Sequence, residues 1–216
     1  MLPSQLISEA VGAGWVDAGE LRIPPGNVQP ASLDLRLGES AYRIRCSFLP
    51  GEKQVQDKVK NLVVDELDLR REGAVLETGR AYLVPLAETL TLPDFVRGKA
   101  NPKSSTGRLD VFTRVITDYS YRFDEIAPGY HGQLYVEIVP LSFAVRVRQG
   151  LALNQLRLMV GRGGLDDGEL RDMHRDGPLL FIDGRPANDN ELATSGGLFL
   201  SLDLGSTCLL YTSRCV

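Results

Sequence analysis

The sequence predicts a mainly β protein with a short N-terminal helix and a C-terminal arm, and three observations carry this prediction. Glycine and proline number 22 and 12 among 216 residues, and they recur at the short intervals expected of turns between strands. Between these turn residues, polar and apolar side chains alternate over brief segments, which is the period of a half-buried strand. Helical periodicity is restricted to a few short stretches.

The strand patterns are clearest near the N-terminus and in the middle of the chain. Residues 32–37 alternate and stop at Gly38. Residues 133–139, 143–148 and 151–158 alternate in turn, separated by short breaks that contain proline or glycine. Because consecutive strands with short connections usually pair, we expect these three strands to form a meander.

Two stretches favour helix. Residues 3–11 place apolar side chains four positions apart, and Gly12 and Gly14 end this pattern. A second short helix is expected at residues 168–173.

The chain is expected to divide into three parts. Residues 1–160 hold the strand patterns and form the main domain. Residues 161–196 are rich in glycine, aspartate, asparagine and arginine, which is typical of a linker or an arm. Residues 197–216 are expected to begin a truncated second lobe because 199–204 alternate again, whereas the tail 206–216 matches nothing before it and has a doubtful origin.

Composition excludes several classes of protein. With 43% hydrophobic and 24% charged residues, the chain is neither a disordered tail nor a membrane protein. Its N-terminus lacks the basic start and apolar stretch of a signal peptide, and three cysteines are too few for a disulfide framework. A cytoplasmic location is therefore expected. The net charge of −4 argues against a nucleic-acid-binding protein.

Signatures of several common active sites are missing from the sequence. The two histidines, His131 and His174, do not stand in the context of a zinc site, and no C-x-x-C occurs. The sequence contains no P-loop motif, and no G-x-G-x-x-G motif lies between a predicted strand and a helix. Zinc chemistry, histidine-dependent nucleophilic catalysis and dinucleotide binding are therefore not expected.

A basic segment interrupts this acidic chain. Residues 97–122 contain six basic and two acidic residues, which indicates a small anionic ligand, with a solvated basic loop as the alternative. Within it, residues 103–108 combine hydroxyls, a glycine and flanking cations, a pattern that suits a phosphate. The same residues also fit a helix start with Ser104 or Ser105 as the N-cap, and both interpretations stay open.

Glu137 is the candidate general base. Alternation over residues 134–138 places Tyr135 and Glu137 on one face of a strand and the three aliphatic residues on the other. A strand carboxylate usually faces solvent, which is the alternative here. In a partly desolvated cleft the same carboxylate is suited to general-base catalysis.

Four motifs follow one another in a recognisable order: residues 29–38, 103–109 and 126–130, and then Glu137. Together they resemble the dCTP deaminase branch of the dUTPase superfamily over about residues 1–160, and the chain is similar to the first lobe of the long, two-lobed bacterial form. The resemblance implies a distorted β-barrel or jelly-roll of the dUTPase-like type. It also implies a homotrimer, or a two-lobed trimer-like assembly, with sites between subunits.

The resemblance implies roles for individual residues. In dCTP deaminases the glutamate that matches Glu137 activates the water that attacks cytosine C4, without zinc, and helps pass its proton to the departing ammonia. The residues that match Ser104 and Arg108 shape this catalytic site, and Mg²⁺ is bound through the nucleotide phosphates. The implied nucleotide-binding residues are Lys103, Ser104, Ser105, Thr106, Gly107, Arg108, Thr117, Tyr135, Val136, Glu137 and Gln155.

Two positions depart from the family pattern. Ala127 stands where relatives usually carry an aspartate, which in the dUTPase branch activates the water that attacks the phosphate chain. Asp124 and Glu125 lie close by but out of register. Lys103 stands where arginine is commoner, and a lysine does not pair two phosphate oxygens as arginine does.

The implied activity is hydrolytic deamination of dCTP to dUTP and ammonia, which supplies dUMP for thymidylate synthesis. Ala127 argues against hydrolysis of the triphosphate. A dUTP diphosphatase and a non-catalytic lobe that binds nucleotide or holds an assembly together stay open as alternatives, as does inhibition by dTTP.

Overall fold

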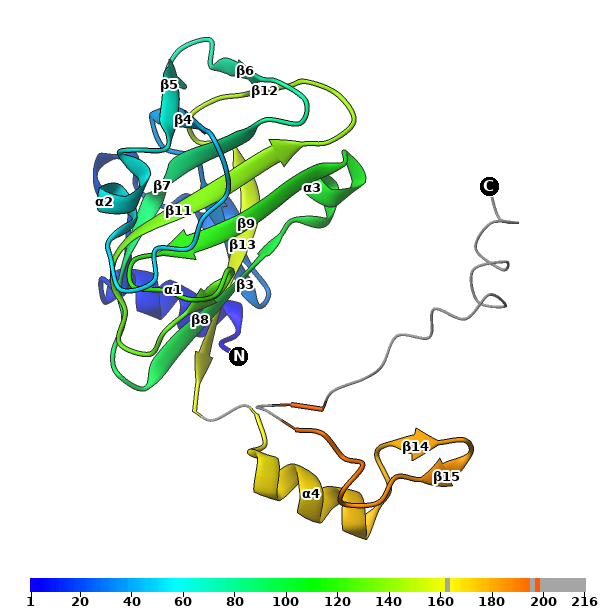
Figure 1. Cartoon of the computed structure of the whole chain (residues 1–216). Coiled ribbons are helices and arrows are strands. Elements are labelled where there is room, and N and C mark those ends of the chain that lie inside the picture. Colours follow the sequence, from blue (N-terminus) through cyan, green and yellow to red (C-terminus); the bar gives the residue numbers. More distant parts are fainter. Residues whose placement is uncertain (162–163, 195–196, 199–216) are drawn as a thin grey trace. The chain divides into compact units, whose positions relative to one another are not determined.

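The chain folds as two units, Met1–Gly161 and Arg162–Val216 (Figure 1). The computed structural model describes residues 1–161, 164–194 and 197–198. The expected second lobe, including the strand pattern at 199–204, therefore lies almost entirely outside the described residues. No helix in the described part is both long and apolar enough to cross a membrane.

Antiparallel strands build the first unit (Figure 1). The larger sheet has the order β5 (Val63–Asp68), β4 (Ser40–Ile44), β7 (Ala81–Thr91), β11 (His131–Pro140) and β9 (Val111–Thr117), with β1 (Val16–Asp17) also paired to β7. The second sheet has the order β10 (Glu125–Ile126), β8 (Val96–Pro102), β13 (Ala152–Val160), β3 (Ser32–Arg36) and β2 (Val28–Gln29). A separate pair consists of β6 (Ala74–Leu76) and β12 (Val145–Val147).

Helices in this unit are short. The predicted N-terminal helix is α1 (Ser4–Gly12), whose buried Ile7 and Ala10 belong to the main core. The other helical segments are α2 (Val55–Val59), α3 (Ser104–Arg108) and the 3-10 turns η1 (Gly19–Leu21) and η2 (Pro25–Asn27).

One apolar core lies between the two sheets. Alternation sends Leu33 and Leu35 of β3 and Val136 and Ile138 of β11 into it, where all four are fully buried. This is the pattern expected when one face of each sheet is covered. The prediction of a mainly β domain is confirmed. Among the described residues the two sheets remain open layers with their own edge strands and do not close into a barrel.

The predicted three-strand meander is wrong. β11 belongs to the larger sheet and β13 to the second sheet, whereas β12, which lies between them in the sequence, pairs with β6. β11 ends at Pro140, which has no N–H to continue a ladder, and the turn at Gly150 has a φ of +80°, which favours glycine. Alternation shows which face a side chain occupies but not which strand is its neighbour.

A second apolar cluster covers the outer face of the larger sheet. Its buried members are Ile44, Phe48, Val55, Leu83, Ile116 and Tyr135. They come from the segment 44–62, which contains α2, and from the strands β7, β9 and β11 beneath it. Side chains of β11 that point away from the main core are therefore buried as well.

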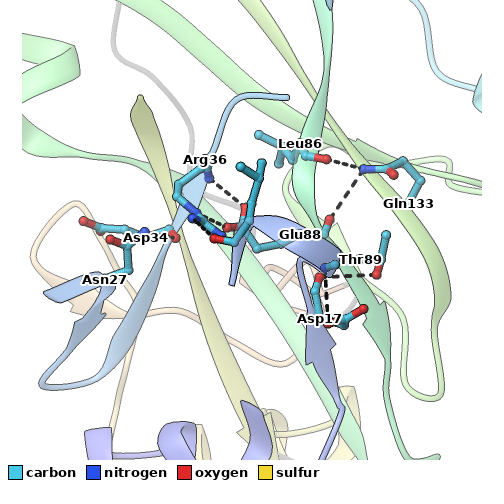
Figure 2. A network of polar contacts seen from close by, with 10 residues as sticks. Asp17, Asn27, Asp34, Arg36, Leu86, Glu88, Thr89 and Gln133 are labelled. Carbon is cyan, nitrogen blue, oxygen red and sulfur yellow. Dashed lines mark hydrogen bonds and ion pairs between the residues drawn. The ribbon is translucent and has the colours of Figure 1, made fainter. Parts of the chain in front are cut away.

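A buried ion pair links the two sheets (Figure 2). Arg36 of β3 donates from its Nε to Oε1 of Glu88 on β7, and its backbone N–H donates to Oε2, each at 2.7 Å. Its Nη1 donates to the carbonyl oxygen of Leu21 at 3.0 Å. Glu88 is fully buried, and this burial raises the pKa of its carboxyl despite the opposing effect of the Arg36 hydrogen bonds.

The interval predicted as a linker or an arm contains folded elements. The helix α4 (Asp167–Asp176) includes the predicted helix at 168–173. It begins with a capping box in which the N–H of Glu169 donates to Asp166 at 2.8 Å and the N–H of Asp166 donates to Glu169 at 2.7 Å.

A small hairpin follows α4. Its strands are β14 (Phe181–Ile182) and β15 (Arg185–Pro186), and the two turn residues between them, Asp183 and Gly184, both have positive φ. Buried His174 of α4 accepts from the Leu179 N–H through Nδ1 at 3.0 Å and contacts the Ala187 carbonyl oxygen through Nε2 at 2.7 Å, so it joins the helix to the hairpin.

Candidate active site

Glu137 lies in the middle of β11 and is only 1% exposed. Its neighbour on the same face, Tyr135, packs in the second cluster, whereas Leu134, Val136 and Ile138 point into the main core. The predicted division of the strand into two faces is confirmed. The alternative of a solvent-facing carboxylate is wrong, because the Glu137 side chain is buried.

Arg114 of β9 stands directly opposite Glu137 in the β9–β11 ladder. Its Nη2 and Nε donate to the same carboxylate oxygen, Oε1, at 3.0 and 3.2 Å. The second oxygen, Oε2, is buried and has no hydrogen-bond partner among the described residues. The result is a carboxylate with one oxygen held and one oxygen available to accept a proton.

Sequence reasoning missed Arg114. The signal was present, because Arg114 lies between Thr113 and Val115, which are both buried, and alternation therefore places the arginine on the outer face. Which strand lies beside β11 is not visible in the sequence, so the pairing with Glu137 was not predictable.

The basic motif 103–108 forms α3, at the start of β9 (Figure 1). The N-cap of this helix is Lys103, without a side-chain cap, so the interpretation of Ser104 or Ser105 as the N-cap is wrong. Ser104, Ser105 and Arg108 are exposed, whereas buried Thr106 donates from Oγ1 to the Leu153 carbonyl oxygen at 2.8 Å. The turn is thus anchored by Thr106 and presents its other hydroxyls and Arg108 outward.

Lys103 and Gln155 are both engaged within the chain. The Lys103 ammonium pairs with the buried carboxylate of Asp34 on β3. Gln155 of β13 accepts from the Ser32 hydroxyl at 3.0 Å. Their roles toward a nucleotide stay predictions.

The turn that leads into β11 is rigidly held. The Tyr130 hydroxyl donates to the Gln133 carbonyl oxygen at 2.7 Å and accepts from the Asp118 N–H at 3.2 Å, and burial raises the pKa of Tyr130. A Cβ at Gly132, which has a φ of +155°, would lie 2.8 Å from that hydroxyl. Asp118 in turn accepts from the Val55 N–H of α2 at 2.7 Å, so the turn and the covering segment are tied together.

Ala127 is exposed and carries no acid, so it does not supply the aspartate that the family resemblance leads us to expect at this position. Asp124 does not replace it, because its carboxylate accepts from the Val115 N–H at 2.8 Å and belongs to the backbone of β9. Burial raises the pKa of Asp124. Glu125 is exposed and pairs with Arg122 at 3.4 Å.

Two hollows flank these residues. One, of about 490 Å³, is lined by Thr117, Ala127 and the cations Arg97, Lys99 and Arg122 among others. The other, of about 520 Å³, lies between the end of α3 and β9, and its lining includes Gly107, Phe112, Arg114 and Phe123.

The structure does not bring all the predicted catalytic residues together. Within the described residues, no hydrogen bond or ion pair joins Ser104 or Arg108 to Glu137. The described part also holds no group of three or more histidine, cysteine, aspartate or glutamate side chains placed to bind a metal ion.

Comparison with known proteins gives one consistent result. A family model described as the 2′-deoxycytidine 5′-triphosphate deaminase (DCD) N-terminal domain matches residues 1–162. Curated dCTP deaminases named as dUMP-forming are similar: one from Mycobacterium sp. (strain KMS) is 32% identical over 71% of this chain and 80% of its own length, and one from Parafrankia sp. (strain EAN1pec) is 31% identical over 71% and 75%.

A solved 2′-deoxycytidine 5′-triphosphate deaminase from Agrobacterium tumefaciens superposes with a TM-score of 0.72 and 47% identity. The match covers 82% of this chain and 52% of that protein, so the chain spans about half the length of the solved enzyme. The family resemblance drawn from the sequence motifs is confirmed: the chain belongs to the dCTP deaminase family.

Proposed function

We propose that this chain catalyses the hydrolytic deamination of dCTP. One observation carries the proposal: in a chain that matches the deaminase domain over residues 1–162, Glu137 is 1% exposed and keeps one carboxylate oxygen without a partner in the part of the chain that the structure describes. A buried carboxylate that keeps such an oxygen is equipped to move a proton. Its surroundings exclude bulk water, which strengthens electrostatic interactions with a reacting group.

Glu137 acts as the proton carrier in this proposal. It takes a proton from water as the water oxygen bonds to cytosine C4, and it delivers that proton to N3. It then carries the hydroxyl proton of the tetrahedral intermediate to the amino nitrogen. The C4–N bond breaks, ammonia leaves, and the oxygen on C4 becomes the carbonyl of uracil. These steps consume one water molecule and require no zinc.

The nucleotide phosphates are assigned to α3. Ser104, Ser105 and Arg108 are exposed there, and hydroxyls with a guanidinium bind phosphate oxygens well. Mg²⁺ enters as part of the substrate, as the magnesium complex of dCTP. Because no hydrogen bond or ion pair joins Glu137 to α3 among the described residues, the proposal includes a homotrimer or trimer-like assembly in which another copy or lobe supplies α3. Inhibition by dTTP and a cytoplasmic location stay predictions.

The proposed product is dUTP. Ala127 lacks the carboxylate that would activate a water for attack on the phosphate chain, and Asp124 is engaged with the backbone of β9. A second candidate product is dUMP, and the observation in its favour is that the curated relatives are named dUMP-forming.

The test is ammonia release from dCTP with excess Mg²⁺, with and without a chelator of transition metals, combined with chromatography of the nucleotide products. We expect ammonia and dUTP in equal amounts, both unaffected by the chelator. Formation of dUMP and pyrophosphate would establish the second candidate. Binding of dCTP without turnover would contradict the proposal and indicate a non-catalytic lobe.

A further inference from the structure

We propose that Arg114 is a positioning residue for the reaction, which holds the Glu137 carboxylate so that Oε2 faces the reacting water. The inference rests on the proposed deaminase function. It concerns a residue of β9 that stands apart from the motifs 103–108 and 126–130.

The first argument is the geometry of the pair. Arg114 and Glu137 are direct partners in the β9–β11 ladder, so the backbone sets the distance between them. Both donated hydrogen bonds end on Oε1, at 3.0 and 3.2 Å. A carboxylate held at one oxygen by two donors of a planar guanidinium cannot rotate freely, so the direction of Oε2 is determined as well.

Arg114 is itself held from several sides. Its guanidinium lies 3.7 Å from the centre of the Phe123 ring and 5.2 Å from that of Phe112, and its Nη2 also donates to the Ser47 hydroxyl. Cation–π contacts of this kind contribute most where water is excluded. The side chain is 24% exposed, so the guanidinium is fixed without being enclosed.

The third argument is that Arg114 joins the carboxylate to a hollow. Arg114 is part of the lining of the 520 Å³ hollow, whereas Glu137 is not part of that lining and is 1% exposed. The guanidinium therefore contacts both the hollow and the buried carboxylate. Arginine stays protonated, so a proton taken from water ends on Glu137 rather than on Arg114.

The experiment compares kcat and KM of the wild-type protein, Arg114→Lys and Arg114→Met, with Arg43→Met as a matched control. Arg43 is an arginine of the same sheet in a partly exposed ion pair with Glu77, away from the site. We expect Arg114→Met to lower kcat about 10- to 100-fold with little change in KM, because misplacing a catalytic group costs rate rather than binding. Arg114→Lys should recover part of kcat, and Arg43→Met should match the wild type.

A double variant separates positioning from folding. Because Arg114 acts through Glu137, adding Arg114→Met to Glu137→Gln should not lower kcat any further. General damage to the fold would instead lower the residual kcat of the Glu137→Gln protein again. Wild-type kcat in a folded Arg114→Met protein would overturn the inference and leave the deaminase function standing. A wild-type protein that binds dCTP but releases no ammonia would instead overturn the proposed function.

Discussion

Two arginine–glutamate pairs of the first unit have a buried glutamate, and they differ in how many carboxylate oxygens the arginine binds. In the pair between the sheets, Arg36 occupies both oxygens of Glu88, and the carboxylate is fully buried (Figure 2). In the pair on the outer face, Arg114 occupies only Oε1 of Glu137, and Oε2 is buried with no hydrogen-bond partner within residues 1–161, 164–194 and 197–198.

Under the proposed function, this difference separates a structural pair from the pair at the reacting carboxylate. Desolvating a charge is costly, and the cost is offset only when the oxygens of the carboxylate are satisfied, as in Glu88. A buried carboxylate oxygen without a hydrogen bond costs stability. Under the proposed function the reacting water meets this oxygen of Glu137, and the two pairs should therefore respond in opposite ways to the same kind of substitution.

The largest expected effect is the loss of activity in Glu137→Gln. The amide keeps the size and one acceptor of the side chain but does not accept and release the proton, so kcat should fall by about 10²- to 10⁴-fold. Affinity for dCTP should stay close to wild type. Steady-state kinetics measure kcat, and a binding isotherm measures the affinity for dCTP. Wild-type turnover in this variant would contradict the assignment of Glu137 as the proton carrier.

Glu88→Ala should damage stability instead. Removing one partner leaves the Arg36 charge buried and unpaired, which costs about 3–5 kcal/mol. Denaturant unfolding followed by fluorescence of the single tryptophan, Trp15, reports on this unit. The exposed Glu72→Ala is the control and should stay within about 0.5 kcal/mol of wild type. A similarly small change in Glu88→Ala would show that the two sheets do not depend on the pair.

The Glu88 pair should also give the protein a pH-dependent stability. Burial raises the pKa of Glu88 in the folded state, so the folded protein holds this proton more tightly than the unfolded chain does. The contribution of this group to the free energy of unfolding is therefore largest below the unfolded carboxyl pKa of about 4.3 and is lost as the pH rises through the raised value. Unfolding across this range should show the wild type losing stability relative to Glu88→Gln as the pH rises, because Gln does not titrate. A constant difference would contradict the raised pKa.

The smallest expected effect comes from Phe123→Leu. Removing the ring beneath the Arg114 guanidinium takes away a cation–π contact worth about 0.5–1 kcal/mol and loosens the arginine. We expect kcat to fall about two- to fivefold, as a barrier change of this size implies. Phe143→Leu, at a half-exposed phenylalanine, is the matched control for ring removal. Equal rates in the two variants would show that the ring does not hold Arg114 in its working position.

Part of the candidate site was visible in the sequence. Alternation placed Glu137 and Tyr135 on one face of a strand, and the structure confirms this. The motif order indicated the family, and the comparisons confirm it. The serine N-cap of α3 was wrong because Lys103 occupies the N-cap, and Ser104 and Ser105 are the first residues of the helix itself.

One further feature of the structure, the hairpin in the second unit, has a local signal in the sequence. The hairpin after α4 turns at Asp183 and Gly184, a dipeptide that favours two-residue turns with positive φ. The polar composition of residues 161–196 predicts a linker or an arm instead. A polar composition indicates that little apolar surface is available for burial. In this segment the buried His174 nevertheless joins α4 to the hairpin through contacts of both ring nitrogens.

The sequence alone determined the mainly β class, the face that each side chain of β3 and β11 occupies, and the membership of the family. These are local properties, because the pleat of a strand alternates side chains wherever the strand is placed. Tertiary structure decided that β12 leaves the meander, that the segment 44–62 packs on the outer face of the larger sheet, and that Arg114 stands beside Glu137. Strand pairing and covering loops join residues that are distant in sequence, and their energies depend on the whole packing arrangement. The sequence therefore predicts Glu137 as a candidate site residue, whereas its pairing with Arg114 is visible only in the structure.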